Sequence, residues 1–377
     1  MHILVLNSGS STLKYSVVDT SANHSLYQNV LEWTVADGGE PPPLPDLDFA
    51  GTNTAIDAVA HRVVHGGADF SGPAELTDDT VQAIERASAL APLHNQAALQ
   101  VIHHARQRYP GLPQIAVFDT GFHRDLPEHA RRYAVPDHWH QQHGLRRYGF
   151  HGISHASVAR QAASALQRPP AELRLISLHL GSGASACAIA GGRSIDTSMG
   201  MTPLEGLVMG TRSGDLDIGA ALHVARREGW TPEQLEQALT RDSGLQGLCD
   251  DSEMRTILAR CQQGDDRALL ALSIYCYRIR KYIGAYIAVL GGLDAVIFTG
   301  GVGENAAAVR AGACEGLRTL GIAIDCQKNA LTSGDQPTAI QTEDSAIAVL
   351  VIPSREDLEI ARQTAEFLAQ RSRQNVH

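Results

Sequence analysis

Three turns in this sequence combine glycine with hydroxyl or amide residues in a way that could bind an anion. The first is SGSST at 8–12, with Lys14 two residues beyond it; the second is GSGAS at 181–185, and the third is GGVGEN at 300–305. Glycine lets backbone N–H groups approach a phosphate closely, and hydroxyls add donors. A single such turn is better explained as an ordinary hairpin. Two similar turns, with a third that leads into a helix, favour the phosphates of a nucleotide.

Charged residues that interrupt apolar segments are a second set of candidates. Arg62 lies inside a strand predicted to be buried, Asp119 directly follows another strand, and Arg212 lies among glycines and small residues. An arginine in an apolar strand needs an anionic partner or a ligand. Considered alone, Arg62 and Arg212 are explained equally well by a ligand site and by a structural ion pair, for example with Asp119.

Histidines are the third set. His94, His151 and His155 each lie in a polar interruption of an apolar segment. Taken singly, each is better explained as an interior histidine with hydrogen-bond partners. The spacing of His151 and His155 suits two metal ligands on a helix, but the glutamate of a zinc protease is missing, so we expect no structural zinc. A magnesium ion held by one or two oxygens, with water and phosphates, needs no motif.

The elements that must position these residues are strands alternating with helices. The first turn joins strands at 3–6 and 13–18, and the same strand–turn–strand pattern returns at 173–190, which indicates two similar halves. The sequence further predicts strands at 55–64, 114–118 and 295–299, helices at 77–90, 95–108, 154–166, 231–239, 267–290, 305–320 and 355–370, and loops at 37–48 and 137–149. This alternation predicts an α/β protein, and a cleft between two such halves would be a preferred place for a ligand.

Length and composition exclude several classes of protein. The 377 residues suffice for two domains, and an apolar content of 44% suits a globular protein with a large core. A net charge of −10 without a basic run argues against nucleic acid or an anionic membrane as a partner. We expect no signal peptide and no membrane span, because no basic segment precedes the first apolar run and no run is long enough. Six cysteines without a CxxC pair predict reduced thiols in a cytoplasmic protein.

The third turn also supports a competing hypothesis. The segment 301–306 fits the GxGxxA form of the dinucleotide-binding fingerprint, and Asp325 follows about 20 residues later, which would indicate an NAD-dependent dehydrogenase. Too few residues remain after Asp325 for the rest of that fold. The hypothesis also leaves the first two turns without a role.

Long motifs, in order along nearly the whole chain, resemble those of the acetate kinase family. They are VLNSGSSTLKYSVVD, HRVVHGG, APLHNQ, VFDTGFH, YGFHGISH, HLGSGAS, DTSMGMTPLEGLVMGTRSGDLD, FTGGVGEN and REDLEIARQT. The resemblance implies two ribonuclease-H-like α/β domains, the actin-like ATPase fold, with an interdomain nucleotide cleft. Residues 1–123 with 357–377 would form the N-terminal domain, and 124–356 the C-terminal, nucleotide-binding domain. It also implies a homodimer.

The same resemblance implies a role for individual residues. The catalytic residues would be Asp119, His151 and Arg212. The carboxylate or acyl phosphate would be bound by Arg62, and its methyl group by a pocket of Val64, Leu93, Phe150 and Pro203. The metal ion would lie near Asn7 and Glu356. The nucleotide would be bound by Lys14, Ser10, Thr12, His179, Leu180, Gly181, Ser182, Gly183, Glu253, Met254, Arg255, Gly301, Val302, Gly303, Glu304 and Asn305.

Three features depart from the family's pattern. Ser182 replaces the usual asparagine and has a shorter reach toward a phosphate, and Glu253 replaces the usual aspartate. The chain is also shorter than typical members, largely around the proline-rich 37–48 segment.

The implied reaction is a reversible, Mg²⁺-dependent transfer of the γ-phosphoryl group from ATP to acetate, which gives acetyl phosphate and ADP; Mn²⁺ is an alternative metal. Acetate is already ionised at neutral pH, so it needs no general base, and Asp119 is expected to orient an arginine or the metal. A propionate or butyrate kinase is the alternative within the family, because one methylene discriminates by only about 1–3 kcal/mol. A non-enzymatic ATP-dependent switch would share the fold but not the paired arginines and the apolar pocket.

Overall fold

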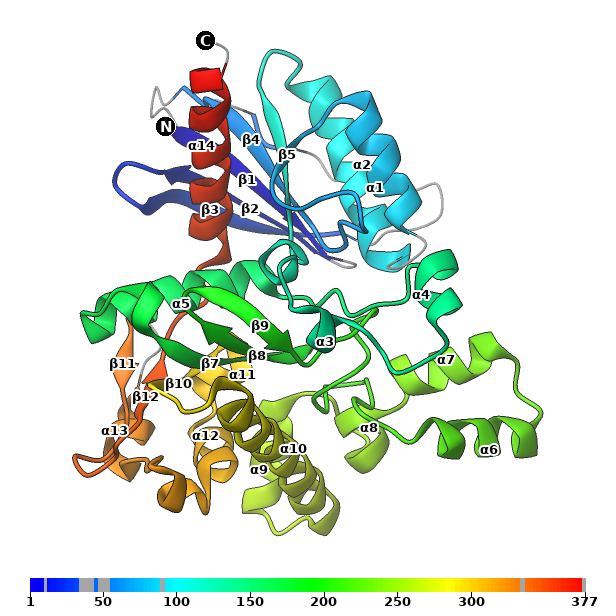
Figure 1. Ribbon diagram of the computed structural model, residues 1–377, viewed down its shortest axis with the longest axis vertical. Helices are drawn as coiled ribbons and strands as arrows, with labels where there is room; N and C mark the ends of the chain where they lie inside the picture. The colour runs from blue at the N-terminus through cyan, green and yellow to red at the C-terminus, as the bar shows by residue number, and fades with distance from the viewer. Residues whose placement is uncertain (10–11, 34–43, 47–54, 89–91, 333–335, 375–377) are drawn as a thin grey trace. The chain divides into compact units, whose positions relative to one another are not determined.

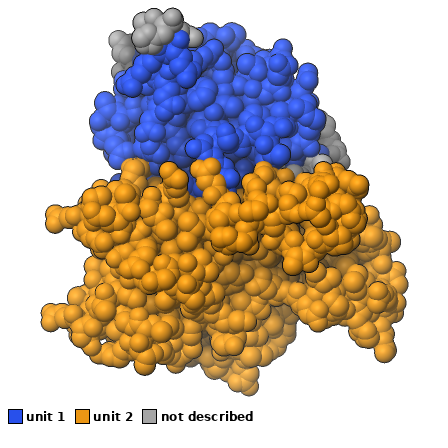
Figure 2. Space-filling model, viewed as in Figure 1, with its two compact units in different colours: residues 1–124, 152–154, 355–377 blue, residues 125–151, 155–354 orange. Residues whose placement is uncertain are grey.

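The computed structural model describes residues 1–9, 12–33, 44–46, 55–88, 92–332 and 336–374. Most of the predicted loop at 37–48 therefore lies outside the described residues. The chain divides into two compact units (Figure 2): unit 1 consists of residues 1–124, 152–154 and 355–377, and unit 2 of residues 125–151 and 155–354.

Unit 1 is built on a six-stranded mixed sheet (Figure 1). Its strands, in spatial order, are β3 (His24–Glu32), β2 (Thr12–Asp19), β1 (His2–Ser8), β4 (Ala58–Val63), β6 (Gln114–Phe118) and β5 (Ala74–Glu75). Strands β1, β4 and β6 run parallel, and β2, β3 and β5 are antiparallel to their neighbours. The helices of this unit are α1 (Asp78–Ala87), α2 (Pro92–Arg108) and α14 (Glu356–Gln374).

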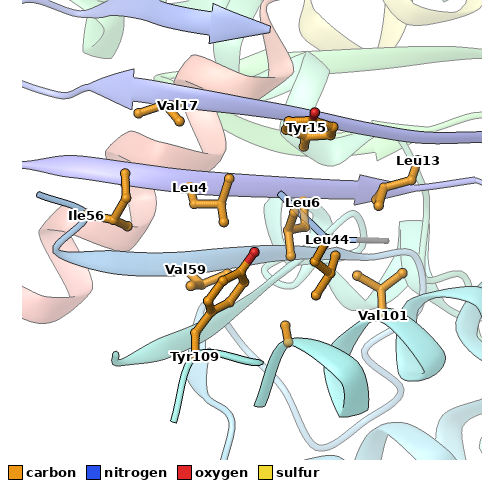
Figure 3. Packing of buried hydrophobic residues seen from close by; sticks show 11 residues of the cluster. Leu4, Leu6, Leu13, Tyr15, Val17, Leu44, Ile56, Val59, Val101 and Tyr109 are labelled. Carbon is orange, nitrogen blue, oxygen red and sulfur yellow. The ribbon is translucent and has the colours of Figure 1, made fainter. Parts of the chain in front are cut away.

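Alternation along β1 supplies the two hydrophobic faces of this sheet. Leu4 and Leu6 pack in one cluster with Tyr109 and with residues of α2 (Figure 3), whereas Ile3 and Val5 pack in another with residues of α14. Successive side chains of a strand point to opposite faces, so an apolar run such as ILVL is what a strand covered on both faces requires. The parallel strands of unit 1 are thus fixed between two helical layers.

Unit 2 repeats the same sheet. Its spatial order is β11 (Thr338–Ala339), β12 (Ala348–Val351), β10 (Ala295–Thr299), β7 (Arg174–Leu180), β8 (Ala184–Ala190) and β9 (Arg193–Thr197). When the strands of each unit are numbered in chain order, both sheets have the spatial order 3-2-1-4-6-5. Strands 1, 4 and 6 are parallel to one another in both units. This duplication, and the α/β class, confirm the predictions from the repeated strand–turn–strand pattern.

Helices connect the strands of unit 2. In chain order they are α3 (Glu128–Arg131), α4 (Asp137–His143), α5 (Gly152–Leu166, whose first three residues belong to unit 1), α6 (Ile218–Glu228), α7 (Pro232–Arg241), α8 (Gly244–Cys249), α9 (Met254–Gln262), α10 (Asp266–Leu290), α11 (Gly300–Asn305), α12 (Ala307–Cys314) and α13 (Cys326–Leu331). None of the helices in the described part of the chain is both long enough and apolar enough to cross a membrane.

Two local predictions were wrong. The segment 137–149 is not entirely a loop, because α4 occupies its first half: Pro136 and Asp137 suit a helix start, and Gly144 ends the helix in the left-handed conformation. The helix predicted at 305–320 begins at Gly300 and is broken at Ala306, whose backbone leaves the helical region and separates α11 from α12.

A buried histidine on β4 links the stability of unit 1 to pH. His61 lies beside Arg62, and its Nε2 is 3.0 Å from Oε1 of Gln114, whose amide nitrogen donates to the carbonyl of Ala105. That oxygen must accept, so Nε2 carries the hydrogen, and Nδ1 has no partner among the described residues. Burial lowers the pKa of His61 from 6.5 to about 4, because a proton on Nδ1 would be a buried, unpaired charge.

We therefore predict an acid-side loss of stability that depends on His61. Below about pH 6.5 the unfolded chain binds a proton at this residue and the folded chain does not, so the free energy of unfolding falls until about pH 4, by about 3 kcal/mol in total. In His61→Gln the free energy of unfolding should change less steeply between these pH values, because one fewer proton is taken up on unfolding. This difference in slope does not depend on how stable the variant is at neutral pH. Urea unfolding across this range, with the exposed His138→Gln as the control, measures it. Parallel slopes for all three proteins would refute the assignment.

Candidate active site

Predicted site residues of unit 1 gather where its parallel strands end. Asn7 is the next-to-last residue of β1, Arg62 lies near the end of β4, and Asp119 directly follows β6. Parallel neighbours bring their carboxyl ends to one edge of a sheet, where ligands bind in open α/β sheets. The backbone N–H of Asp119 donates to the carbonyl of Val63 at 2.9 Å, which fixes the start of the loop against β4.

Arg62 is the centre of this group, which we call the unit 1 cluster (Asn7, Arg62, Asp119 and Glu356). Its Nε and Nη2 donate to the two carboxylate oxygens of Asp119 at 3.2 and 2.5 Å, and its Nη1 donates to Oδ1 of Asn7 at 3.1 Å. Burial alone would lower the pKa of Arg62, but the carboxylates of Asp119 and Glu356 outweigh it and raise the pKa. A guanidinium has five N–H donors, and these bonds leave two for a ligand.

The oxygens near Arg62 fit a magnesium ion. The half-buried carboxylate of Glu356, at the start of α14, acts on Arg62 electrostatically, and no hydrogen bond or ion pair occupies it within the described part of the chain. Carboxylate and amide oxygens suit Mg²⁺, which keeps several water ligands and binds few protein groups. The described residues hold no cluster of three or more histidine, cysteine or acidic side chains that could bind a metal unaided.

The first turn can be described only in part. Ser10 lies outside the described residues. Gly9 donates its N–H to the carbonyl of Thr12 at 2.7 Å, which closes the turn. Lys14 is exposed and lies directly opposite Asn7 in the β1–β2 register, so the two side chains share a face of the sheet.

The loop after β4 is held by two residues that sequence reasoning did not single out. Asn95, fully buried in α2, accepts from the N–H of His65 and donates to its carbonyl, at 3.0 and 2.9 Å. Thr120 accepts from the N–H of Gly66 at 3.2 Å. The polar residues of the PLHNQ motif, at the start of the predicted helix, were the available signal. These bonds position Val64, which is almost completely buried.

The second turn and Arg212 form the core of the unit 2 cluster (His151, His179, residues 181–185 and Arg212). The N–H of Gly181 donates to the carbonyl of Gly183, and Gly210 donates to the carbonyl of Ser182, both at 3.0 Å. A Cβ atom at Gly183 would lie 3.5 Å from Nη1 of Arg212 and from Cε1 of His151. The glycine thus leaves the turn open toward a guanidinium and an imidazole.

Arg212 differs from Arg62 in having no carboxylate partner among the described residues. Its Nη1 donates to the carbonyl of Pro203 at 3.0 Å, which brings this predicted pocket residue next to it. Burial lowers the pKa of Arg212, which means that the protein environment disfavours its charge. The described contacts of this half-buried cation are all neutral groups, so an anionic ligand would supply the opposite charge that it lacks.

His151 is held in an uncommon backbone conformation. It precedes α5 with a φ of 56°, in the left-handed region that non-glycine residues rarely adopt. Its ring stacks on that of His179, with centroids 4.2 Å apart and planes inclined by 28°. Its Nδ1 lies 2.9 Å from the hydroxyl of Ser185. Backbone strain and these two side chains thus direct the imidazole toward the second turn.

The third turn is fixed by its own side chains. Glu304 Oε1 accepts from the N–H of Gly300 at 2.9 Å and from that of Ser354 at 3.1 Å, and the side-chain amide of Asn305 donates to the carbonyl of Gly301. The fully buried Arg310 donates to the carbonyls of Gly303 and Glu304. Glu304 therefore shapes the turn, and Arg310 is a second support that the sequence did not reveal.

The remaining predicted residues lie in several places. Phe150 is buried in unit 2, as is Met254 at the start of α9, whereas its neighbours Glu253 and Arg255 are exposed. Leu93 lies in α2, but its side chain is outside the described part of the structure. Of the residues predicted to form the methyl pocket, Val64 belongs to unit 1, and Phe150 and Pro203 belong to unit 2.

Comparison with known proteins identifies the family. The model of the acetokinase family matches residues 45–362. The chain belongs to the acetokinase family. It is 47% identical to an acetate kinase of Streptomyces griseus, over 98% of this chain and 97% of that protein. A solved acetate kinase of Porphyromonas gingivalis superposes with a TM-score of 0.87 at 36% sequence identity, and the match covers 97% of this chain and 99% of that one. A solved propionate kinase of Francisella tularensis superposes with a TM-score of 0.87 at 38% sequence identity, and the match covers 96% of this chain and 98% of that one.

Membership of the acetokinase family decides between the earlier hypotheses. The fold is that of acetate and propionate kinases, the actin-like ATPase fold, as the resemblance implied. The dehydrogenase alternative was wrong: Asp325, the acidic residue of its fingerprint, instead accepts from the N–H groups of Gln327 and Lys328 and caps α13.

Gly152 offers a test of how Asp119 is positioned. Its N–H donates to the carbonyl of Asp119 at 2.8 Å, and a Cβ at this position would lie 2.2 Å from that oxygen. Gly152→Ala must therefore displace the backbone at Asp119, and we predict a loss of about 1–3 kcal/mol in the free energy of unfolding, with reduced phosphoryl transfer. Gly121→Ala, where nothing lies within 4 Å, is the control. Equal behaviour of the two variants would contradict the prediction.

Proposed function

We propose that this chain transfers the γ-phosphoryl group of ATP reversibly to acetate, giving acetyl phosphate and ADP. The observation that carries the proposal is Arg212, a half-buried cation without a carboxylate partner in the described part of the chain, beside His151 and the open face of Gly183. This is the environment that a transferring phosphoryl group requires, because its charge is spread over three oxygens.

Repulsion between the two anions is the main obstacle to this reaction. Two unit charges about 4 Å apart, at an effective dielectric constant near 20, repel by roughly 4 kcal/mol. In the proposed mechanism the two remaining N–H groups of Arg62 bind the carboxylate, since the planar fork matches its two oxygens. Arg212 and Nε2 of His151 donate to the phosphoryl oxygens, where negative charge develops in the transition state.

Asp119 orients Arg62 and does not act as a base. Both of its oxygens accept from Arg62, and the carboxylate is 1% exposed. Acetate is ionised at neutral pH and has no proton to lose before it attacks. The paired carboxylate therefore keeps the guanidinium in one orientation and partly balances its charge.

Magnesium belongs to this proposal. Asn7 and Glu356 would hold the ion through oxygens, directly or through water. When bound, Mg²⁺ supplies positive charge that neutralises the nucleotide phosphates. The segments 181–183, 253–255 and 301–305 would hold the nucleotide, with Lys14, Ser10 and Thr12 approaching its phosphates.

A homodimer in the cytoplasm is the form that we propose. Apolar side chains remain exposed on helices of unit 2, among them Ile218 on α6 and Leu270 and Tyr277 on α10, and a second copy would cover such a surface. All six cysteines are free thiols, which is typical of a reducing compartment.

Arg212→Ala tests the proposed function. Purified wild-type chain with Mg²⁺, ATP and acetate should form acetyl phosphate, detected as its hydroxamate, and Arg212→Ala should lower kcat by about three orders of magnitude with little change in ATP affinity. Arg318→Ala, which removes an exposed arginine paired with Asp344, is the control and should behave as wild type. A wild-type chain without acetyl phosphate formation would refute the function, and a decrease below tenfold would refute the role of Arg212.

A propionate or other short-chain carboxylate kinase is the second candidate, because the fold matches the propionate kinase of Francisella tularensis as closely as the acetate kinase of Porphyromonas gingivalis. If Val64 lines the methyl pocket, Val64→Ala should raise kcat/KM for propionate relative to acetate by about 10-fold or more, since one methylene corresponds to about 1–3 kcal/mol. The exposed Val30→Ala is the control. An unchanged ratio would exclude Val64 from the pocket.

A further inference from the structure

A chain of hydroxyls and imidazoles in unit 2 connects His151 to the interior. Ser185 Oγ lies between two histidines, 2.9 Å from Nδ1 of His151 and 2.8 Å from Nε2 of His155. The other nitrogen of His155, Nδ1, lies 2.9 Å from Oγ of Ser177. His155, Ser177 and Ser185 are fully buried, so these groups are a built feature of the core and not a surface contact.

Secondary structure explains how the chain of groups is assembled. His151 and His155 are four residues apart at the start of α5, so they lie on one face of that helix. Ser185 on β8 lies directly opposite His179 on β7, and Ser177 lies two residues before His179, so all three side chains share one face of the sheet. The spacing that resembled a metal-binding pair is thus used to place two imidazoles against serine hydroxyls.

The hydrogen count restricts what these groups can do. A serine hydroxyl has one hydrogen, so Ser185 donates to one imidazole and accepts from the other. If Ser177 donates to His155 and His155 donates to Ser185, then Ser185 donates to Nδ1 of His151, and the hydrogen of a neutral His151 is on Nε2. If all bonds are reversed, Nδ1 of His151 donates to Ser185, and a neutral His151 has only a lone pair on Nε2.

Nε2 is the atom that matters for the reaction. It would lie 3.6 Å from a Cβ at Gly183, so this edge of the ring faces the second turn. A hydrogen on Nε2 stabilises a phosphoryl oxygen there, whereas a lone pair repels it. Because Ser185 can reverse its bond, Nε2 also keeps its hydrogen when His151 is charged: Nδ1 then donates to Ser185, which donates to His155.

We propose that Ser185 and His155 are positioning residues that keep a hydrogen on Nε2 of His151, where it donates to the transferring phosphoryl group. This inference rests on the proposed function of His151. Neither residue touches the substrates in this role; both act through the orientation and the hydrogen placement of one imidazole. In this arrangement Ser177, at the far end, donates to Nδ1 of His155.

Kinetics of serine variants test the proposal in the full-length chain. Ser185→Ala should lower kcat by about tenfold or more and leave the KM values for ATP and acetate within about twofold, because the lost interaction acts in the transition state. Ser185→Thr retains the hydroxyl and should recover most of the loss. Ser194→Ala removes another buried serine hydroxyl of the same sheet and should behave as wild type. An unchanged kcat in Ser185→Ala, or a loss confined to KM, overturns the proposal.

Nuclear magnetic resonance of ¹⁵N-histidine-labelled protein separates this role from a merely structural one. The imidazole signals of His151, assigned by their disappearance in His151→Gln, should show the hydrogen on Nε2 in the wild type and a shift of population toward Nδ1 in Ser185→Ala. A hydrogen on Nδ1 in the wild type, or a loss of kcat with an unchanged His151 spectrum, overturns the proposal.

Two further controls keep the result interpretable. If the Ser185 variants do not fold, His155→Gln is measured in the same two ways and judged by the same outcomes. The spectrum of the wild-type protein can be recorded without any turnover. A chain that forms no acetyl phosphate would therefore refute the proposed function, and the spectrum would still show which nitrogen of His151 carries the hydrogen.

Discussion

Unit 1 is organised around one electrostatic constraint, a guanidinium carried by an interior strand of its sheet. Such a charge is tolerated only where fixed acceptors surround it. Asp119 supplies both carboxylate oxygens because β6 ends beside β4, Asn7 adds its amide oxygen because β1 ends on the other side, and Glu356 contributes its charge from the start of α14. The strand order of the sheet is therefore also the arrangement that satisfies Arg62, and these bonds use three of its five N–H donors.

The same strand order supports different chemistry in unit 2. There β7 ends in the glycine-rich second turn, and β10 leads into α11. Glu304 of α11 accepts from the backbone N–H groups of Gly300 and Ser354. Unit 1 thus compensates its cation with carboxylates, whereas Arg212 in unit 2 is contacted by a backbone carbonyl and by the sulfur of Met209. The two copies of the scaffold thus carry different side chains around their arginines, as is common where one α/β fold is used twice.

The sequence predicted what depends on local patterns and failed where distant residues decide. Apolar runs located the central strands of both sheets, and the repeated turn indicated the duplication, whereas β3, β5, β9, β11 and β12 were not predicted. The pairing of Arg62 with Asp119 remained one of two explanations, because residues 57 positions apart meet only through strand order. Asn95, Ser185 and Arg310 were missed for the same reason: each is an ordinary polar residue until its buried partners are known. The break at Ala306 was missed because alanine is a good helix former, so its residue type does not indicate the non-helical backbone that it adopts there.

Helix α14 has a consequence for how the molecule is made. It covers the face of the unit 1 sheet that carries Ile3 and Val5, yet it is the last of the described elements to emerge during synthesis. Unit 2 lies between the two main segments of unit 1 in the chain, so its sheet is complete on the ribosome while the unit 1 sheet still lacks one of its layers. Until α14 emerges, the apolar face that carries Ile3 and Val5 lacks the helix that covers it in the folded chain.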